Sequence, residues 1–284
     1  MKHPFRKKWG QNFLVDNNLL IKIARTINPK PDNYILEIGP GEGALTEKIL
    51  PHINEMIGIE IDPLLIEKLK INNLMKGLNL IKGDVLLFEI KDLPISNPIR
   101  VIGNIPYNIT SPIIFWLIEQ LDYWDDAFLM VQKEVANRLV AETSTKSYGR
   151  LTVVVGAYLN IEIMFSIPPD VFIPKPKVES AFIHLTKKSK PLINDEKYIQ
   201  FNKIVSSAFN QRRKMLKNSM KSWNFSDQII KNIDFSRRPE TLSIKEFASL
   251  VELESPVHYS YVVLFVVMNV DLLDRAVYIL IPIV

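Results

Sequence analysis

The chain has 284 residues, of which 47% are hydrophobic and none is cysteine. This length and apolar content suffice for one large core with a smaller domain beside it, and the lack of cysteine excludes disulfides, cysteine-ligated zinc and thiol nucleophiles. Lys and Arg outnumber Asp and Glu by 35 to 31, a net charge of +4 that suits a polyanionic partner without requiring one.

The first two thirds of the chain alternate between helical and extended patterns. Apolar residues at helical spacing from Leu19 to Ala24 predict a first helix, which ends before Asn28 and Pro29. The alternation that follows is typical of a mainly parallel sheet covered by helices on both faces. The predicted strands are Tyr34–Ile38, Met56–Ile61, Leu78–Ile81, Ile99–Ile102, Phe128–Gln132, Thr152–Tyr158 and Ala181–Leu185, and the predicted helices among them are Ala44–Leu50, Leu64–Met75 and Lys133–Glu142.

The last third of the chain differs in composition. The polar stretch Lys187–Pro191 predicts a linker, and helical patterns run from Glu196 to Leu250. We therefore expect an α/β, Rossmann-like domain over residues 1–188 and a small all-helical domain over residues 189–254. Residues 255–284 form an apolar tail of unknown role, split by Asp271, Asp274 and Arg275 into runs shorter than the about 20 residues that span a bilayer. With no signal-peptide core behind the basic amino terminus, we expect a cytoplasmic protein with no membrane partner.

A glycine-rich turn follows the first predicted strand. The segment Glu37–Gly43 contains Gly39 and Gly41, which let the backbone turn sharply and approach a ligand closely. Two further carboxylates end the next strands: Glu60, placed to accept ribose hydroxyls, and Asp84, placed to bond an adenine amino group. Any one of these is more often an ordinary turn or a solvated strand end, but the three together predict a nucleoside site.

The acidic turn distinguishes between two nucleoside ligands. The pyrophosphate of NAD favours a loop without acidic residues, whereas Glu37 and Glu42 crowd this one. S-adenosylmethionine has no phosphate, and its sulfonium and ammonium groups are cationic. The sequence therefore favours S-adenosylmethionine as the cofactor, with NAD as a distant alternative and no metal required.

The fourth strand runs into the segment Asn104–Tyr107. An adenine amino nitrogen is a poor nucleophile because its lone pair is delocalised into the ring. The side-chain oxygen of Asn104 and a main-chain carbonyl in the turn before Pro106 could accept its two N–H groups and direct the lone pair at a methyl group, while Tyr107 stacks on the base. Such a turn alone is common after strands, but its place beside a nucleoside site favours adenine methylation.

These segments resemble the bacterial small-subunit ribosomal RNA adenine dimethyltransferases, a family that includes the eukaryotic dimethyladenosine transferases. The resemblance covers nearly everything from Lys8 to about Leu250. The segments that carry it are Lys8–Leu14, Glu37–Gly43, Gly103–Ile109, Gln132–Val135, Tyr148–Leu151, Phe172–Val178 and Ala208–Leu216.

The resemblance implies both site residues and a substrate. Tyr107 and Phe172 would hold the target adenine between them. The reaction would be N6,N6-dimethylation of two adjacent adenosines in the 3′-terminal hairpin of small-subunit rRNA. The substrate would be an immature small subunit, and we expect the enzyme to be a monomer. The residues that it implies for S-adenosylmethionine are Asn12, Leu14, Gly39, Glu60, Asp84 and Asn104.

Basic residues in the predicted helical domain suggest where RNA binds. Arg212, Arg213, Lys214 and Lys217 form a candidate backbone-binding face, although a solvated helix would look the same without the neighbouring domain. Two alternatives remain open: a macrolide-resistance methyltransferase that acts on large-subunit rRNA, and a ribosome-assembly or RNA-binding factor without catalysis.

Overall fold

The computed structural model describes residues 11–93, 98–252, 261–264 and 279–282. Its centre is one mixed sheet in the order β4-β3-β2-β5-β6-β9-β7. The first five strands of this order are parallel, and β9 and β7 are antiparallel to their neighbours. The sheet strands are β2 Tyr34–Ile38, β3 Glu55–Glu60, β4 Leu78–Lys82, β5 Ile99–Asn104, β6 Trp124–Gln132, β7 Leu159–Ile167 and β9 Ser180–Lys187.

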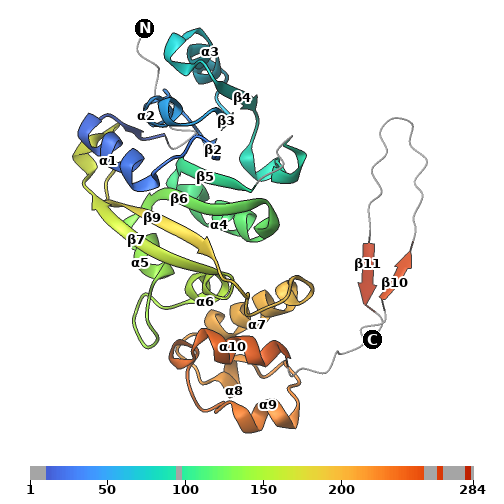
Figure 1. The fold of residues 1–284 in the computed structure, drawn as a ribbon. Helices are drawn as coiled ribbons and strands as arrows, with labels where there is room; N and C mark the ends of the chain where they lie inside the picture. Colours follow the sequence, from blue (N-terminus) through green and yellow to red (C-terminus); the bar gives the residue numbers. More distant parts are fainter. Residues whose placement is uncertain (1–10, 94–97, 253–260, 265–278, 283–284) are drawn as a thin grey trace.

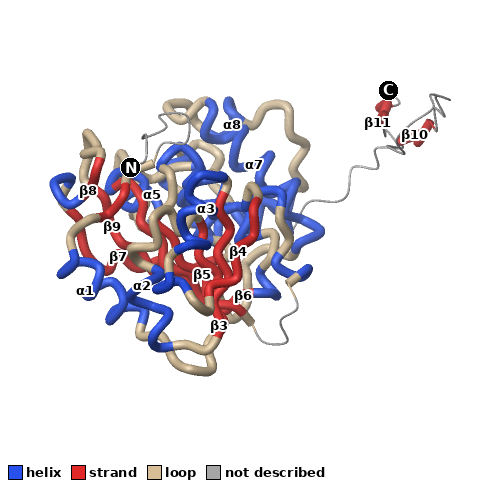
Figure 2. The backbone as a smooth tube through the Cα atoms, turned by 90° about the horizontal axis from the view of Figure 1, so that it is seen from above, coloured by secondary structure: helices blue, strands red, loops and turns tan. Residues whose placement is uncertain are grey.

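Helices lie outside both faces of this sheet (Figures 1 and 2). Successive residues of a strand point to opposite faces, so Ile35 of β2 packs in the core with α1 and α2, while Leu36 packs in the core with α4, α5 and α6. This arrangement confirms the predicted α/β class. The helices of this part are α1 Asn17–Ile27, α2 Thr46–Ile49, α3 Pro63–Ile71, α4 Thr110–Ile118, α5 Lys133–Leu139 and α6 Arg150–Gly156.

One predicted strand is wrong. The sequence predicts an extended Thr152–Tyr158, but residues Arg150–Gly156 form helix α6. Val153, Val154 and Val155 are all fully buried, so the helix is apolar on every side and shows no helical stripe in the sequence. The Thr152 hydroxyl also accepts a hydrogen bond from the Gly149 N–H at 3.1 Å, which caps the first turn.

Two elements of the sheet domain were not predicted. Helix α4 is almost uniformly apolar, and strand β7 follows α6 directly and pairs with β9. Outside the sheet, β1 Phe13–Leu14 pairs with β8 Phe172–Ile173, which brings the amino-terminal segment against a part of the chain far away in sequence.

The helical region forms the lower end of the molecule in Figure 1. It begins after β9 and shares the large core with α6 through buried side chains such as Phe201 and Phe247. Tyr148 joins the two parts, since its phenol donates to the Leu242 carbonyl at 2.7 Å. The helices here are α7 Tyr198–Asn210, α8 Leu216–Ser219, α9 Asp227–Asn232 and α10 Ile244–Glu252.

Most of the predicted tail, residues 255–284, lies outside the described residues. The described parts are β10 Tyr261–Leu264 and β11 Ile279–Pro282, which pair antiparallel as a separate two-stranded sheet. Within the described part of the chain, every helix falls short of the length and apolarity that crossing a membrane requires. The domain boundaries at residues 188 and 254 stay predictions.

Candidate active site

A cavity of about 310 Å³ lies at the carboxyl edge of the parallel strands. The order β4-β3-β2-β5 brings the ends of these strands side by side, where the crossovers from β2 diverge and a crevice forms. Every residue predicted for the cofactor lines this cavity. These residues are Asn12, Leu14, Gly39, Gly41, Glu60, Asp84 and Asn104.

The glycine turn is fixed to the end of the next strand. Gly39 and Gly41 have φ angles of 65° and 61°, a conformation that favours glycine. The Glu60 carboxylate accepts the Gly41 N–H at 3.0 Å and the N–H groups of Ile61 and Asp62 at 2.9 Å each. Burial raises the pKa of Glu60, and these N–H groups act in the opposite direction. Glu60 thus ties β3 to the turn while it faces the cavity.

Glu37 is a second buried carboxyl group in the same wall. It is 2% exposed, and its Oε2 accepts the Thr46 hydroxyl at 2.5 Å. Burial raises its pKa to about 7; the bond from Thr46 lowers it and the nearby charge of Glu60 adds to the increase. Asp84 faces the cavity from the turn after β4, where its Oδ1 also accepts the Leu86 N–H at 3.0 Å. Glu42 lines the cavity as well, so four residues with carboxyl groups surround a site that suits a cation.

The amino-terminal segment forms another wall of the cavity. It is held in place by β1–β8 pairing and by the Val15 N–H, which donates to the Val171 carbonyl at 2.9 Å. Gln11, Phe13 and Val15 line the cavity beside the predicted Asn12 and Leu14. The Oε1 atom of Gln11 is buried without a hydrogen-bond partner among the described residues. Sequence reasoning missed Gln11 as a polar group for a ligand, although it lies inside the quoted segment Lys8–Leu14.

Asn104 ends β5 and connects this wall to the predicted catalytic turn. Its side-chain amide donates to the Asn12 carbonyl at 2.8 Å, so its Oδ1 is the atom that can accept a substrate N–H. Ile105 and Pro106 line the same cavity as Asn104, and Ile105 is 1% exposed. The amino-terminal segment and the turn Asn104–Tyr107 are therefore linked by a direct hydrogen bond.

The two aromatic residues predicted to hold the base are placed differently. Tyr107 opens a short 3₁₀ turn, is half-buried, and shares a hydrogen bond of 2.5 Å with the Ser180 hydroxyl. Phe172 is 2% exposed and packs in the core with Leu14 and Phe182. Neither is among the described residues that line the cavity. Phe172 also pairs with Leu14 in the β1–β8 sheet, so the base-holding role of these two rings stays a prediction.

The four predicted RNA-binding residues also fall into two groups. They lie on the turn between α7 and α8 and on α8 itself, where Arg213, Lys214 and Lys217 are exposed. Arg212 instead makes internal contacts, because its guanidinium donates to the carbonyls of Thr145 and Lys146 at 2.8 and 2.7 Å. Its Nε lies 3.4 Å from the Glu240 carboxylate. Arg212 therefore holds the loop between α5 and α6 against the helical region.

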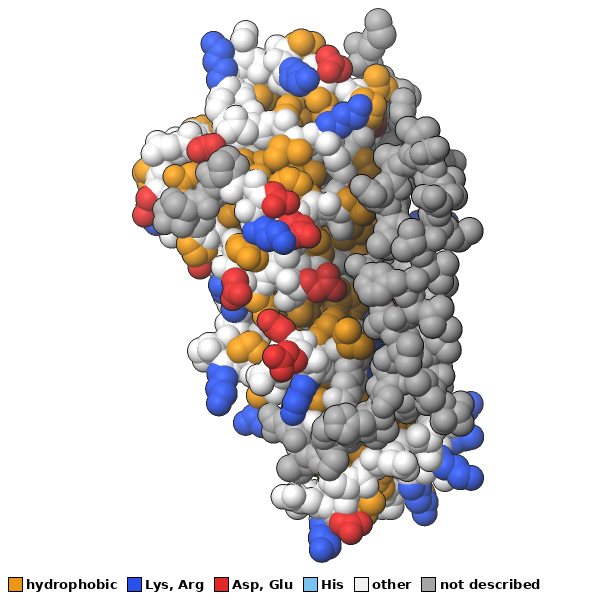
Figure 3. Space-filling view, turned by 90° about the vertical axis from the view of Figure 1, so that its right-hand side faces the viewer, with side chains coloured by type: hydrophobic (Ala, Val, Ile, Leu, Met, Phe, Trp, Pro, Cys, Tyr) orange, Lys and Arg blue, Asp and Glu red, His pale blue; other side chains and the backbone are white. Residues whose placement is uncertain are grey.

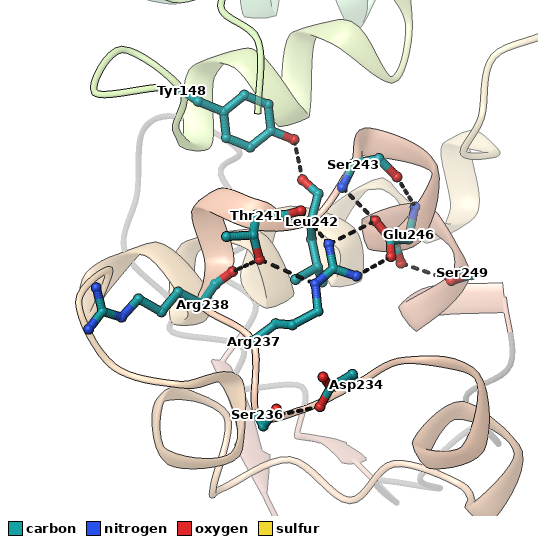
Figure 4. A network of polar contacts seen from close by, with 10 residues as sticks. All are labelled: Tyr148, Asp234, Ser236, Arg237, Arg238, Thr241, Leu242, Ser243, Glu246 and Ser249. Atoms are coloured by element: carbon teal, nitrogen blue, oxygen red, sulfur yellow. Dashed lines mark hydrogen bonds and ion pairs between the residues drawn. The ribbon is translucent and has the colours of Figure 1, made fainter. Parts of the chain in front are cut away.

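Arg237 of the helical region also makes contacts within the protein. Arg237 bonds the carboxylate of Glu246 and the main chain and hydroxyl of Thr241. The carbonyl of the neighbouring Arg238 accepts the Thr241 hydroxyl, whereas its side chain extends away from this network (Figure 4). On the face shown in Figure 3, Lys and Arg gather at the lower end of the molecule, over the helical region, and Asp and Glu are more frequent above it. The exposed Arg213, Lys214 and Lys217 belong to the helical region, whereas all residues that line the cavity lie between Gln11 and Met130.

The chain matches a known protein family over most of its length. The model of the ribosomal RNA adenine dimethylase family matches residues 2–254. A ribosomal RNA small subunit methyltransferase A from Herminiimonas arsenicoxydans is 40% identical over 253 residues, which is 88% of this chain and 98% of the relative. The protein of the same name from Legionella pneumophila strain Corby is 40% identical over 260 residues, 90% of this chain and all of the relative.

Solved structures agree with these relatives. A dimethyladenosine transferase from Plasmodium falciparum is similar with a TM-score of 0.71 and 26% identity, covering 84% of this chain and 95% of that one. The 23S rRNA methyltransferase ErmE is similar with a TM-score of 0.63 and 27% identity, covering 86% of this chain and 99% of that one. Both similarities include the helical region, because each covers more of the chain than the sheet domain alone contains.

Proposed function

Because the chain belongs to the ribosomal RNA adenine dimethylase family, we propose that it transfers methyl groups from S-adenosyl-L-methionine to two adjacent adenosines of small-subunit ribosomal RNA, giving N6,N6-dimethyladenosine. The observation that carries this function is the shared cavity at the carboxyl edge of the sheet. There the acidic glycine turn and the Asn104–Tyr107 turn line one space, and the Asn104 amide bonds the segment that closes it.

The cavity residues fit the cofactor. S-adenosyl-L-methionine supplies an electrophilic methyl group on a sulfonium, and it also carries an ammonium group and an adenosine. The carboxylates of Glu60 and Asp84 suit these cations, and the buried Oε1 of Gln11 needs a donor. Glu37 is partly protonated near neutral pH, because burial raises its pKa to about 7. The remaining carboxylate lone pairs of Glu60 can accept the ribose hydroxyls, and Asp84 can accept the adenine amino group.

The catalytic turn prepares the target nitrogen. Asn104 Oδ1 and the Ile105 carbonyl accept the two N–H groups of the adenine, which holds its lone pair toward the methyl group and out of conjugation. Tyr107 stacks on one face of the base. Phe172 stacks on the other once its ring is uncovered, so we infer that binding of the base separates Phe172 from part of its core contacts.

The target bases lie in a hairpin loop, where unpaired adenines need little unstacking to enter a pocket. Arg213, Lys214 and Lys217 are exposed and contact the RNA backbone, while Arg212 positions the loop beside them. We further infer that the substrate is an immature small subunit, that the enzyme acts as a monomer, and that it is cytoplasmic.

A second function has a specific observation in its favour. The structure of the 23S rRNA methyltransferase ErmE is similar over 86% of this chain, so this fold also suits an enzyme that acts on large-subunit rRNA. The relatives that are about 40% identical over nearly their whole length carry the small-subunit name, and we therefore favour the small-subunit substrate.

The substrate can be tested with purified particles. The enzyme is given labelled S-adenosyl-L-methionine and either small or large subunits that lack adenine dimethylation, and the rRNA is digested and analysed by mass. We expect dimethyladenosine at two adjacent positions of the small-subunit rRNA. Label in the large subunit alone would favour the ErmE-like function, and binding of cofactor and subunits without transfer would favour an assembly factor.

A further inference from the structure

The Tyr107 phenol is bonded to a residue that the proposed chemistry does not use. Its oxygen lies 2.5 Å from the Ser180 hydroxyl, and the two residues are separated by 73 positions in the chain. Tyr107 belongs to the turn after β5, whereas Ser180 is the first residue of β9. The bond therefore connects the platform for the base to the antiparallel half of the sheet.

Ser180 is a rigid attachment point. It is fully buried and is paired on both sides, with Gln132 of β6 and with Ile167 of β7. The preceding residue is also fixed, since the Glu179 carbonyl accepts the Lys133 N–H at 3.0 Å and the Glu179 carboxylate lies 2.6 Å from the Lys133 ammonium group. A hydroxyl at this place moves little relative to the strands around it.

The Tyr107 ring has less support of its own. It stands at the start of a three-residue 3₁₀ turn after Pro106 and is only half-buried. Without a partner for its phenol, the ring could rotate about its side-chain bonds and change the plane on which a base stacks. A tyrosine phenol is neutral near pH 7, and burial raises the pKa of Tyr107 further while the bond with Ser180 acts in the opposite direction, so the phenol remains protonated.

We propose that Ser180 is a positioning residue for methyl transfer, which fixes the plane of the Tyr107 ring and thereby the direction of the adenine amino group. This inference rests on the proposed function, because it assigns to Tyr107 the role of stacking on the target base. Ser180 does not line the cofactor cavity in the described part of the chain, so its loss leaves cofactor binding unchanged. Its effect falls on the rate of transfer.

The test is a double-mutant cycle with Ser180→Ala and Tyr107→Phe, which remove the same bond from its two ends. For each variant and for the pair, kcat of methyl transfer, the affinity for S-adenosyl-L-methionine and the melting temperature are measured. Ser166→Ala is the matched control, because Ser166 is exposed on the adjacent strand β7 opposite Ala181. We expect kcat to fall about fivefold to tenfold in each single variant and no further in the pair, with cofactor affinity unchanged.

The outcomes separate the two levels of the proposal. If the wild type transfers methyl groups and Ser180→Ala is as fast as Ser166→Ala, the positioning role is wrong while the proposed function stands. Losses that multiply in the pair also contradict it, because they mean two independent effects. If Ser180→Ala does not fold, Tyr107→Phe decides alone, and an unchanged kcat there overturns the inference. A wild type without any transfer overturns the proposed function itself.

Discussion

At the scale of single residues, Glu37 makes a prediction about stability and pH. Burial raises its pKa from 4.5 to about 7 in the folded protein. Between these values the unfolded chain loses a proton that the folded chain retains, so folding stability decreases as pH rises and this loss is complete above pH 7. At about 1.4 kcal/mol per pKa unit, the contribution is about 3 kcal/mol.

The substitution Glu37→Gln removes this titration and retains an acceptor for the Thr46 hydroxyl. The free energy of unfolding is measured with urea in the absence of cofactor. We expect its value for the variant to increase by about 3 kcal/mol relative to that of the wild type when the pH is raised from 4.5 to 8. For each protein, the free energy of unfolding at pH 4.5 is the reference for its value at pH 8. A difference between the two proteins that does not change with pH would show that Glu37 titrates in the folded state as it does in water.

The location of single residues in the fold could be predicted from the sequence where a motif fixes them locally. Gly39 and Asp84 come just after parallel strands, and Asn104 is the last residue of one. Adjacent parallel strands end at one edge, so these residues are expected to line one cavity, as they do. Phe172 and Arg212 could not be placed in this way. The exposure of Phe172 depends on pairing with Leu14, and the contacts of Arg212 depend on a loop 66 positions away.

At the scale of elements, the glycine turn makes a prediction about cofactor affinity. Gly41 has a φ of 61°, and a Cβ atom there would lie 3.0 Å from the Phe13 ring of the segment that closes the cavity. Gly41→Ala therefore strains the turn and displaces that segment, and we expect about tenfold weaker binding of S-adenosyl-L-methionine by calorimetry. The control is Gly149→Ala, whose Cβ would have no neighbour within 4 Å and which should bind as the wild type does.

The turn between α7 and α8 contains two adjacent arginines with different roles: Arg212 makes internal contacts, and Arg213 is exposed. Arg212→Ala removes charged hydrogen bonds to two carbonyls, and we expect it to lower the free energy of unfolding by about 1–3 kcal/mol. Arg213→Ala should leave stability unchanged but lower the salt dependence of rRNA hairpin binding, with a slope smaller by about 0.7–0.9. Equal stability of the two variants, or a salt slope unchanged in Arg213→Ala, would contradict this division.

The elements that sequence patterns missed are those without a periodic signal. Helices α4 and α6 are apolar on nearly all sides because other elements surround them, so they carry no stripe that separates helix from strand. The strands around the cofactor were predicted because each short apolar run ends in Gly or in an acidic residue. Tertiary burial thus decided the conformation of the elements that lie deepest.

At the scale of the whole molecule, the family match and the described helices both end near residue 254. We expect the chain truncated after Glu254 to retain its melting temperature and its rate of methyl transfer, because every residue assigned to the cavity and to RNA lies before that point. A truncated protein that stays soluble but loses transfer would show that residues 255–284 take part in activity.

The central claim is that the Asn104 turn activates an adenine amino group beside the cofactor cavity. The direct measurement is transfer of labelled methyl groups to under-methylated small subunits by the wild type and by Asn104→Ala, with cofactor affinity measured for both. We predict paired dimethyladenosines from the wild type and a rate at least about 100-fold lower in the variant, with cofactor affinity within about tenfold. An Asn104→Ala enzyme that transfers methyl groups at the rate of the wild type would contradict the account.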